Sequence, residues 1–278
     1  MDSKNGNSVG SVMVVGGGPG GLEAARVAAL RGHKVTLYEK ATKLGGQLNL
    51  AAAVPFRQEM SKIPKYFSAQ SEKAGVDIRL NTEVTKELVR EVKPDVLVVA
   101  TGAEPWIPNI PGADGKRVVS AHDVLGDKVD LLPGNVVIVG GGMVGCETAE
   151  TLADRGDNPI IGRTDVTLLE MVDDVALDTA PQSRDLLMQR LREKGVRILT
   201  SAKVIEFLED GIVLERDGRE ETLRGVDRIV LSMGVKSVDS LSAQVQEEVA
   251  EVYAIGDAKE TRSALEAIAE GAELGRRI

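Results

Sequence analysis

The chain has little of the chemistry that cysteine and histidine supply. Its 278 residues include one cysteine, Cys146, and two histidines. A single cysteine excludes a disulfide within the chain, a Cys-x-x-Cys redox pair and a cysteine-ligated iron–sulfur cluster, and it is typical of a protein of the reducing cytoplasm. Two isolated histidines do not make a metal-ligand set. We therefore expect no metal site and a cytoplasmic location.

The sequence also lacks an excess of positive charge and long apolar runs. It has 34 Lys and Arg residues against 43 Asp and Glu, which gives a formal net charge of −9. This balance argues against nucleic acid or an anionic membrane as a partner. No apolar run approaches the ~20 residues that a membrane span needs. Residues 1–10 are polar and rich in Gly, Ser and Asn, so we expect a disordered leader rather than a secretory signal.

Short apolar strands alternate with helical segments along the chain. Residues 12–15 and 96–100 are continuous apolar runs, as in strands buried on both faces of a parallel sheet. A second series begins at residues 136–139, after a proline-rich stretch at 103–112 that is typical of a domain boundary. This alternation predicts an α/β fold of two doubly wound, Rossmann-like domains.

The order of the strands predicts how the two domains connect. The second series has its own closing strand at residues 228–232, so the strand at 252–255 is left to close the first sheet. We therefore expect the second domain, residues 105–235, to be inserted into the first, which comprises residues 11–104 and 236–278.

Each series carries the glycine-rich fingerprint of a dinucleotide-binding turn. The first strand is followed by Gly16-Gly17-Gly18-Pro19-Gly20-Gly21, and the strand at 136–139 is followed by Gly140-Gly141-Gly142-Met143-Val144-Gly145. The first glycine of such a turn permits the tight bend, the second lets a pyrophosphate approach the backbone, and the third lets the helix pack closely on the strand. Two copies predict two dinucleotides bound face to face, an arrangement typical of hydride transfer between a nicotinamide and a flavin.

An acidic residue ends the second strand of each series. Glu39 and Glu170 stand where a carboxylate can accept hydrogen bonds from ribose hydroxyls. Because a carboxylate there repels a 2′-phosphate, the second site is expected to favour NADH. NADPH stays the alternative, since Arg155, Arg163 and Arg184 lie nearby in the sequence.

The ordered set of motifs resembles the two-dinucleotide-binding-domain flavoprotein superfamily. Beyond the two glycine turns, the set comprises Leu44-Gly45-Gly46-Gln47-Leu48, Ala100-Thr101-Gly102 and Tyr253-Ala254-Ile255-Gly256-Asp257. The segment 44–48 and the ending 264–271 are most similar to the C-terminal region of the NADH:flavin oxidoreductases of the old-yellow-enzyme type. That family includes dienoyl-CoA reductase, 2-enoate reductase and trimethylamine dehydrogenase.

The resemblance implies that the first site holds FAD and the second NAD(P)H. Gly45 and Gly46 would let the backbone approach the flavin, and Asp257 would bind the ribityl chain. The last helix would point its N-terminus, near Ala264, at the flavin pyrimidine and stabilise negative charge there. The residues expected to bind the cofactors are Gly16, Gly18, Pro19, Gly20, Gly21, Glu39, Lys40, Gly45, Gly46, Gln47, Leu48, Val84, Ala100, Thr101, Gly102, Gly140, Gly142, Met143, Val144, Gly145, Glu147, Glu170, Gly234, Gly256, Asp257 and Ala264.

The chain also departs from the family that it resembles. Relatives of this type carry an N-terminal (β/α)8 barrel with FMN and a four-cysteine iron–sulfur site, and this chain has neither. It is therefore expected to be a reductase half that works with an FMN/iron–sulfur barrel domain or subunit. Relatives that reduce disulfides use a cysteine pair beside the flavin, so thiol–disulfide chemistry is excluded here.

Hydride transfer from nicotinamide C4 to flavin N5 needs the two rings in register and water kept out, with no acid, base or nucleophile from the protein. We therefore name no catalytic side chain. Reduced FAD is expected to pass its electrons to the partner domain. Two alternatives stay open: a structural module that binds only ADP, as in trimethylamine dehydrogenase, and a free-standing NADH oxidase or ferredoxin reductase.

Three residues near the fingerprints have two interpretations each. Cys146 is expected to be a small residue packed under the second turn rather than a reactive thiol. Glu147 is either an ordinary helical glutamate or a residue near the nicotinamide. Arg57 is expected to form a surface salt bridge, the alternative being contact with a cofactor phosphate.

Overall fold

The computed structural model describes residues 9–130, 133–155 and 164–278. Most of the leader expected at residues 1–10 lies outside this range, as does Arg163, and nothing is described of the side chain of Arg155. No helix within the described residues is long and apolar enough to cross a membrane.

The described residues form two compact units. Unit 1 comprises the residues up to Ala52 together with Glu59–Glu104 and Lys236–Ile278, and unit 2 comprises Ala53–Gln58 and Pro105–Val235. The segment Ala53–Gln58 therefore packs with unit 2, although the chain on both sides of it belongs to unit 1 and the expected boundaries placed it there. The assignment of FAD and NAD(P) to the two domains stays a prediction.

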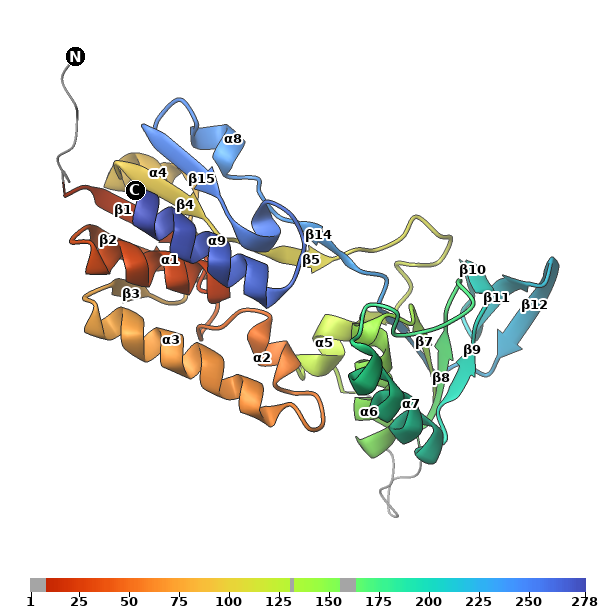
Figure 1. Ribbon diagram of the computed structural model, residues 1–278. Coiled ribbons are helices and arrows are strands. Elements are labelled where there is room, and N and C mark those ends of the chain that lie inside the picture. The colour runs from red at the N-terminus through yellow and green to blue at the C-terminus, as the bar shows by residue number, and fades with distance from the viewer. Residues whose placement is uncertain (1–8, 131–132, 156–163) are drawn as a thin grey trace. The chain divides into compact units, whose positions relative to one another are not determined.

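Unit 1 is built on a parallel sheet with the strand order β15-β4-β1-β2-β3 (Figure 1). Val252 of β15 stands opposite Leu97 of β4, so the strand expected at 252–255 does close the first sheet. The strands are β1 (Ser11–Val15), β2 (Lys34–Tyr38), β3 (Asp77–Arg79), β4 (Val96–Val99) and β15 (Glu251–Ala254).

Helices cover both faces of this sheet, which is why β4 is apolar throughout and β1 is apolar from Val12 onward. Val12 and Val14 pack on one face with residues of α1 and α9, whereas Met13 and Val15 pack on the other with residues of α4 and α8. The helices are α1 (Pro19–Leu30), α2 (Leu48–Ala51), α3 (Lys62–Lys73), α4 (Lys86–Val92), α8 (Ser242–Val245) and α9 (Ala264–Arg277), with 3-10 turns η1 (Gln58–Ser61) and η2 (Gly256–Ala258).

Unit 2 repeats this design with a parallel sheet of order β6-β13-β7-β8-β9. The closing strand expected at 228–232 is β13, which lies between β6 and β7. The strands are β6 (Val118–Ser120), β7 (Asn135–Val139), β8 (Asp165–Leu169), β9 (Arg197–Leu199) and β13 (Arg228–Leu231), and the helices are α5 (Ala121–Leu125), α6 (Met143–Arg155) and α7 (Pro181–Glu193). The expected fold class, with one Rossmann-like domain inserted in the other, is confirmed.

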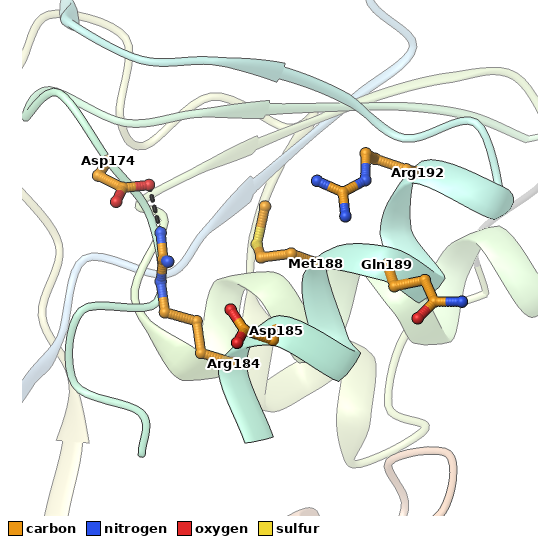
Figure 2. Close-up of a pocket in the computed structure, with 6 residues that line it drawn as sticks. All are labelled: Asp174, Arg184, Asp185, Met188, Gln189 and Arg192. Carbon is orange, nitrogen blue, oxygen red and sulfur yellow. Dashed lines mark hydrogen bonds and ion pairs between the residues drawn. The ribbon is translucent and has the colours of Figure 1, made fainter. Parts of the chain in front are cut away.

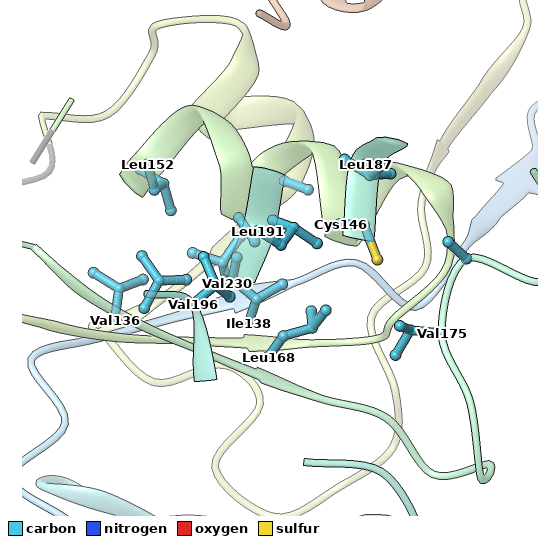
Figure 3. Packing of buried hydrophobic residues seen from close by; sticks show 14 of the residues in the cluster. Val136, Ile138, Cys146, Leu152, Leu168, Val175, Leu187, Leu191, Val196 and Val230 are labelled. Atoms are coloured by element: carbon cyan, nitrogen blue, oxygen red, sulfur yellow. The ribbon is translucent and has the colours of Figure 1, made fainter. Parts of the chain in front are cut away.

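The two faces of the second sheet are covered differently. Ile138 and Leu168 pack against α6 and α7 in the cluster that contains Cys146 (Figure 3). Val137 and Val139 face instead an antiparallel sheet, whose buried residues include Phe207. That sheet comprises β10 (Ala202–Phe207), β11 (Gly211–Arg216) and β12 (Arg219–Arg224).

The longer of the two segments that belong to unit 2, Pro105–Val235, begins and ends in neighbouring strands. β5 (Ala103–Pro105) pairs with β14 (Val235–Ser237) in a two-stranded ribbon. The ribbon is flanked by hydrogen bonds from Trp106 N–H to the Gly234 carbonyl (3.0 Å) and from Val238 N–H to the Gly102 carbonyl (3.0 Å). The first residues of the proline-rich stretch therefore form backbone hydrogen bonds with the returning strand at the point where the chain leaves unit 1.

Glycines let α1 and α9 approach closely in unit 1, where the two helices lie side by side (Figure 1). A Cβ on Gly271 would lie less than 3.0 Å from the carbonyl oxygen of Gly20, and a Cβ on Gly20 equally close to the carbonyl oxygen of Ala267. Backbone atoms cannot yield as a flexible side chain can, so this contact requires glycine on both helices.

We expect Gly271→Ala to lower the free energy of unfolding by about 1–3 kcal/mol, because overpacking against Gly20 outweighs the ~1 kcal/mol that alanine gains in helix propensity. Urea denaturation followed by circular dichroism measures the change. Ala269→Leu adds more bulk at an exposed position of the same helix and serves as the control. A Gly271→Ala protein as stable as the wild type would show that the helices are not in close contact.

Candidate functional site

The first glycine turn joins β1 to α1 and leaves no room for a side chain where it bends. Gly16 has a φ of +108°, and a Cβ there would lie less than 3.0 Å from the carbonyl oxygen of Ala100. A Cβ on Gly21 would lie equally close to the Gly16 carbonyl oxygen. By contrast, a Cβ on Gly18 would meet nothing within 4 Å. The start of α1 is thus open at the position where a pyrophosphate binds in turns of this kind.

Glu39 is held at the end of β2 by the backbone of two neighbouring segments. Its carboxylate accepts hydrogen bonds from the N–H groups of Gly17 (2.7 Å) and Ala41 (2.7 Å). The next segment is held in turn, because Gly45 N–H donates to the Gly17 carbonyl at 2.8 Å. A carboxylate fixed in this way keeps lone pairs for the ribose hydroxyls that the sequence predicts.

The two segments expected to line the flavin lie together in unit 1. Gln47 Nε2 donates to Asp257 Oδ2 at 3.3 Å, and the N–H of Arg262 donates to Asp257 Oδ1 at 3.1 Å. Gly46 stands against the glycine turn, since a Cβ there would lie 3.1 Å from the Cα of Gly18. Segments from opposite ends of the sequence therefore converge beside the start of α1.

Glu270, a residue that the sequence did not single out, fixes the turn that carries Asp257. Its carboxylate accepts a hydrogen bond from Gly256 N–H (2.8 Å) and forms ion pairs with Lys259 and Arg262. Burial raises the pKa of Glu270, but the hydrogen bonds from Arg262 and Gly256 outweigh it and hold the pKa below the usual value. The acid stands on α9, so it ties this turn to the helix.

The other residues predicted to bind a cofactor in unit 1 differ in exposure. Leu48 is buried, and Val84 is half-buried against the core. The Thr101 hydroxyl donates a hydrogen bond to the Val238 carbonyl. Lys40 is exposed. Ala264 begins α9, whose first turn is capped by the hydroxyl of the preceding serine.

The second glycine turn, between β7 and α6, repeats the geometry of the first. Gly140 has a φ of +106°, and a Cβ there would lie less than 3.0 Å from the Ser232 carbonyl oxygen. A Cβ on Gly145 would lie as close to the Gly140 carbonyl oxygen. The Glu170 carboxylate accepts hydrogen bonds from Gly141 N–H (2.6 Å) and from the N–H two residues after Glu170 (3.0 Å), just as Glu39 does in unit 1.

The loop after the acid is repeated as well. Ala176 N–H donates to the Gly141 carbonyl at 2.7 Å, which matches the bond from Gly45 to Gly17. Residues 170–178 therefore correspond one for one to residues 39–47, with Asp178 at the position of Gln47. Gly234, also predicted to bind a cofactor, lies in unit 2 with a φ of +94°.

The starts of the two helices differ in the first helical residue and in what binds it. The first residue of α1 is Pro19, which has no N–H to donate. In unit 2 the N–H of Met143, the first residue of α6, donates to Asp178 Oδ1 at 2.8 Å. A Cβ on Gly142 would lie 3.4 Å from Asp178 Oδ2, whereas Gly18 faces open space. A carboxylate of the chain itself thus stands at the α6 N-terminus. Val144, at the next position, is 38% exposed.

Glu147, on the first turns of α6, is buried and pairs with Arg57. Arg57 comes from the segment Ala53–Gln58, and its Nη2 also lies 3.6 Å from the sulfur of Met143. Burial raises the pKa of Glu147, and the Arg57 charge works in the opposite direction. The salt bridge expected of Arg57 is present, but its partner is a buried acid at the glycine turn rather than a surface group.

Cys146 lies beneath the second turn, fully buried, with its thiol 3.4 Å from the carbonyl oxygen of Gly141. Burial raises the pKa of this thiol to about 12, and the nearby carboxylates of Asp178, Glu147 and Glu170 act in the same direction. The thiolate is the reactive form of cysteine. The structure therefore agrees with a packing role for Cys146.

A hollow of about 590 Å³ lies beside α7, lined by two arginines, two aspartates, a methionine and a glutamine (Figure 2). Arg184 is engaged there, because it pairs with Asp174 and donates to the Val175 carbonyl at 2.9 Å. None of the residues predicted to bind a cofactor lines this hollow. The lining residues are Asp174, Arg184, Asp185, Met188, Gln189 and Arg192.

Comparison with known proteins extends over nearly the whole chain. A family model described as pyridine nucleotide-disulphide oxidoreductase matches residues 10–271. The NADH oxidase of Thermoanaerobacter brockii is 36% identical over 272 residues, which cover 96% of this chain and 41% of that protein. The cinnamate reductase of Clostridium sporogenes is 34% identical over 278 residues, which cover 99% of this chain and 40% of that protein.

Among solved structures, 2-naphthoyl-CoA reductase in complex with 2-naphthoyl-CoA matches with a TM-score of 0.91 and 34% sequence identity. The match covers 98% of this chain and 40% of that one. The chain thus spans about two fifths of the length of each of these three relatives.

We expect Arg57→Ala to lower the free energy of unfolding by about 1–3 kcal/mol at pH 7, because it leaves the buried Glu147 carboxylate without its partner. The pKa of Glu147 is already raised above its unfolded value, and loss of Arg57 raises it further. The loss of stability should therefore shrink as the pH falls toward 5 and the carboxylate is protonated.

Urea denaturation at pH 5 and pH 7 measures this dependence. Arg192→Ala removes an exposed arginine of α7 and serves as the control. The double variant Arg57→Ala/Glu147→Gln should recover part of the loss at pH 7. An Arg57→Ala effect that is the same at both pH values would contradict the assignment.

The Cys146 thiol should resist alkylation in the folded protein at pH 8, since its pKa of about 12 leaves almost no thiolate. Mass spectrometry after incubation with iodoacetamide should show unmodified protein, and the same treatment in urea should give one adduct. Modification of the folded protein as fast as of free cysteine would disprove the buried placement.

Proposed function

The chain belongs to the pyridine nucleotide-disulphide oxidoreductase family, and we propose that within it the protein transfers a hydride from NADH to FAD and passes the electrons to a partner domain. It corresponds to the C-terminal reductase region of the NADH:flavin oxidoreductases of the old-yellow-enzyme type, and its cofactors are FAD and NADH. The observation that carries the proposal is the repetition of one nucleotide-binding turn, with its acid, in two units of one chain.

The residues of unit 1 fit the adenosine and pyrophosphate parts of FAD. Open space beside Gly18 gives a pyrophosphate access to the α1 N-terminus, where the helix dipole and free N–H groups favour an anion. Glu39, oriented by Gly17 and Ala41, would accept hydrogen bonds from the ribose. Lys40, Val84, Ala100, Thr101 and Gly102 stay proposed contacts of the same cofactor.

The contact between Gln47 and Asp257 supports FAD over ADP alone. Both residues belong to segments that the family resemblance assigns to the flavin half of the cofactor, and ADP lacks that half. The turn at Asp257 is held by Glu270, so the carboxylate is fixed before any cofactor arrives. A module that bound ADP only would have no use for this arrangement.

The residues of unit 2 support NADH as the second nucleotide. Glu170 stands where a 2′-phosphate would lie in NADPH, and its charge would repel that phosphate. Arg184, the one nearby arginine whose side chain is described, is engaged by Asp174 and the Val175 carbonyl. We place Glu147 near the nicotinamide because it follows the glycine turn directly on α6 and is held there by Arg57.

Bound FAD supplies the hydride acceptor, so the protein contributes position rather than proton transfer. The glycine turns bring each nucleotide onto a helix start, and the two glutamates fix the riboses. We assign no catalytic side chain. We also assign no chemical role to Cys146, because burial raises the pKa of its thiol to about 12 and so disfavours the thiolate.

A partner for the electrons is implied by the length of the relatives, because the chain matches about two fifths of each. We propose that the partner is a barrel domain or subunit with FMN and an iron–sulfur centre, acting on an unsaturated acid, a thioester or an amine. We also propose a cytoplasmic location, on the ground that a lone buried cysteine suits a reducing compartment.

The test is the visible absorption spectrum of the purified protein, recorded anaerobically before and after addition of NADH. We expect a flavin band that bleaches with NADH in the absence of any partner. A protein that stays colourless after incubation with FAD would overturn the proposal and leave the ADP-binding module. A flavin that turns over rapidly with oxygen alone would favour a free-standing oxidase.

A matched pair of variants separates the two sites. Glu39→Gln should lower the FAD retained after gel filtration, whereas Glu170→Gln should keep FAD but weaken NADH binding by about tenfold or more, since hydrogen bonds to charged groups are worth about 1.5–3 kcal/mol. The same Glu170→Gln variant should discriminate less against NADPH. Weaker binding of NADH in the Glu39 variant alone would reverse the assignment of the two sites.

A further inference from the structure

The two copies of the nucleotide-binding turn agree closely except for what stands at the helix start. In both, the acid binds the second glycine of the turn, and the loop after the acid binds the same glycine through a backbone N–H. This agreement makes the difference at Gln47 and Asp178 informative, because each residue stands eight positions after its acid and two after the N–H that binds the glycine turn.

In unit 1 the side chain at this position binds another loop and does not cap the helix. Gln47 donates to Asp257, and the space beside Gly18 is open. No carboxylate of the chain is hydrogen-bonded at the α1 N-terminus within the described residues. A cofactor pyrophosphate can therefore take this position without displacing anything.

In unit 2 the equivalent side chain occupies the helix start. Asp178 Oδ1 accepts the hydrogen bond of Met143 N–H at 2.8 Å, and Oδ2 lies beside Gly142. A carboxylate at a helix N-terminus satisfies an otherwise unpaired N–H and is stabilised by the helix dipole. The same N–H groups and the same helix dipole bind a nucleotide pyrophosphate, so the carboxylate and the pyrophosphate compete for the α6 N-terminus.

The loop that carries Asp178 is anchored, while the side chain itself is exposed. Ala176 is buried with a φ of +52° and donates to the Gly141 carbonyl, and Arg184 holds the Val175 carbonyl. Asp178 is exposed. The backbone therefore keeps the carboxylate within reach of α6, and a change in side-chain rotamer is enough to release it.

We propose that Asp178 is a built-in anion that competes with the pyrophosphate of NADH for the α6 N-terminus. The inference rests on the proposed function, which places the nicotinamide nucleotide in unit 2. A nucleotide that must displace Asp178 has its apparent affinity reduced by the fraction of protein in which the site is free. Competition in unit 2 alone would make NADH bind more weakly than FAD. FAD would then stay bound through turnover, while NADH would exchange at every cycle.

The test is calorimetric titration of the FAD-loaded protein with NADH under anaerobic conditions and with ADP-ribose, which cannot react. Asp178→Ala removes the competing carboxylate. We expect both ligands to bind about three- to tenfold more tightly to this variant, in line with the strength of a carboxylate at a helix N-terminus. Asp173→Asn loses the same charge at an exposed position of the same loop and should bind both ligands as the wild type does.

Thermal unfolding separates competition from a merely structural role. With competition, Asp178→Ala should lower the melting temperature of the protein free of nucleotide but enlarge the rise that ADP-ribose produces. A carboxylate that only caps α6 would lower the melting temperature and leave the dissociation constants unchanged or higher, which would overturn the inference.

The outcomes are distinguishable from failure of the proposed function. If the wild type binds NADH and Asp178→Ala binds it no better, the competition is refuted and the proposed function stands. If neither protein binds NADH or ADP-ribose, the nicotinamide site in unit 2 is refuted and the inference falls with it. Equal tightening in Asp173→Asn would show a general charge effect and would also overturn the inference.

Discussion

Close approach of backbone to backbone at the two glycine turns is the constraint on which both units are built. At Gly16 and Gly140 a single methyl group would collide with the carbonyl that ends the neighbouring strand. Because the gap is so small, each helix begins directly above the carboxyl edge of its sheet. No side chain caps the start of α1, whereas Asp178 accepts the hydrogen bond of Met143 N–H at the start of α6. In unit 1 the close backbone packing continues along α1, where Gly20 contacts Gly271 of α9. The position of the last helix, and of the turn at Asp257 before it, depends on that contact.

Much of this architecture could be predicted because its determinants are local in the sequence. The strand at 252–255 was expected in the first sheet because the second series was already complete, and it pairs with β4. Other features depend on tertiary contacts that no periodicity reveals. The segment Ala53–Gln58 packs with unit 2, where Arg57 pairs with Glu147 and the Phe56 ring lies against Arg190, and nothing in its composition indicates that.

Helix α4 and the pair β6–α5 were not expected, because these elements are too short for an apolar period to show. Asp178 and Glu270 were missed for a related reason, since single polar residues in a loop or on a helix face carry no pattern. The sequence does carry a signal for Asp178, because it stands eight residues after Glu170 just as Gln47 stands eight residues after Glu39. The residues assigned to cofactor contacts stay predictions, because no ligand contact tests them.

One consequence follows from the pairing of β5 with β14. The chain leaves unit 1 and returns to it through adjacent strands, so the two ends of the long excursion are hydrogen-bonded neighbours. Seen from unit 1, residues 105–235 act as one long loop. The two ends of that loop are only one strand spacing apart, however many residues the loop contains. Closing such a loop carries an entropy cost that grows only slowly with the number of residues inserted.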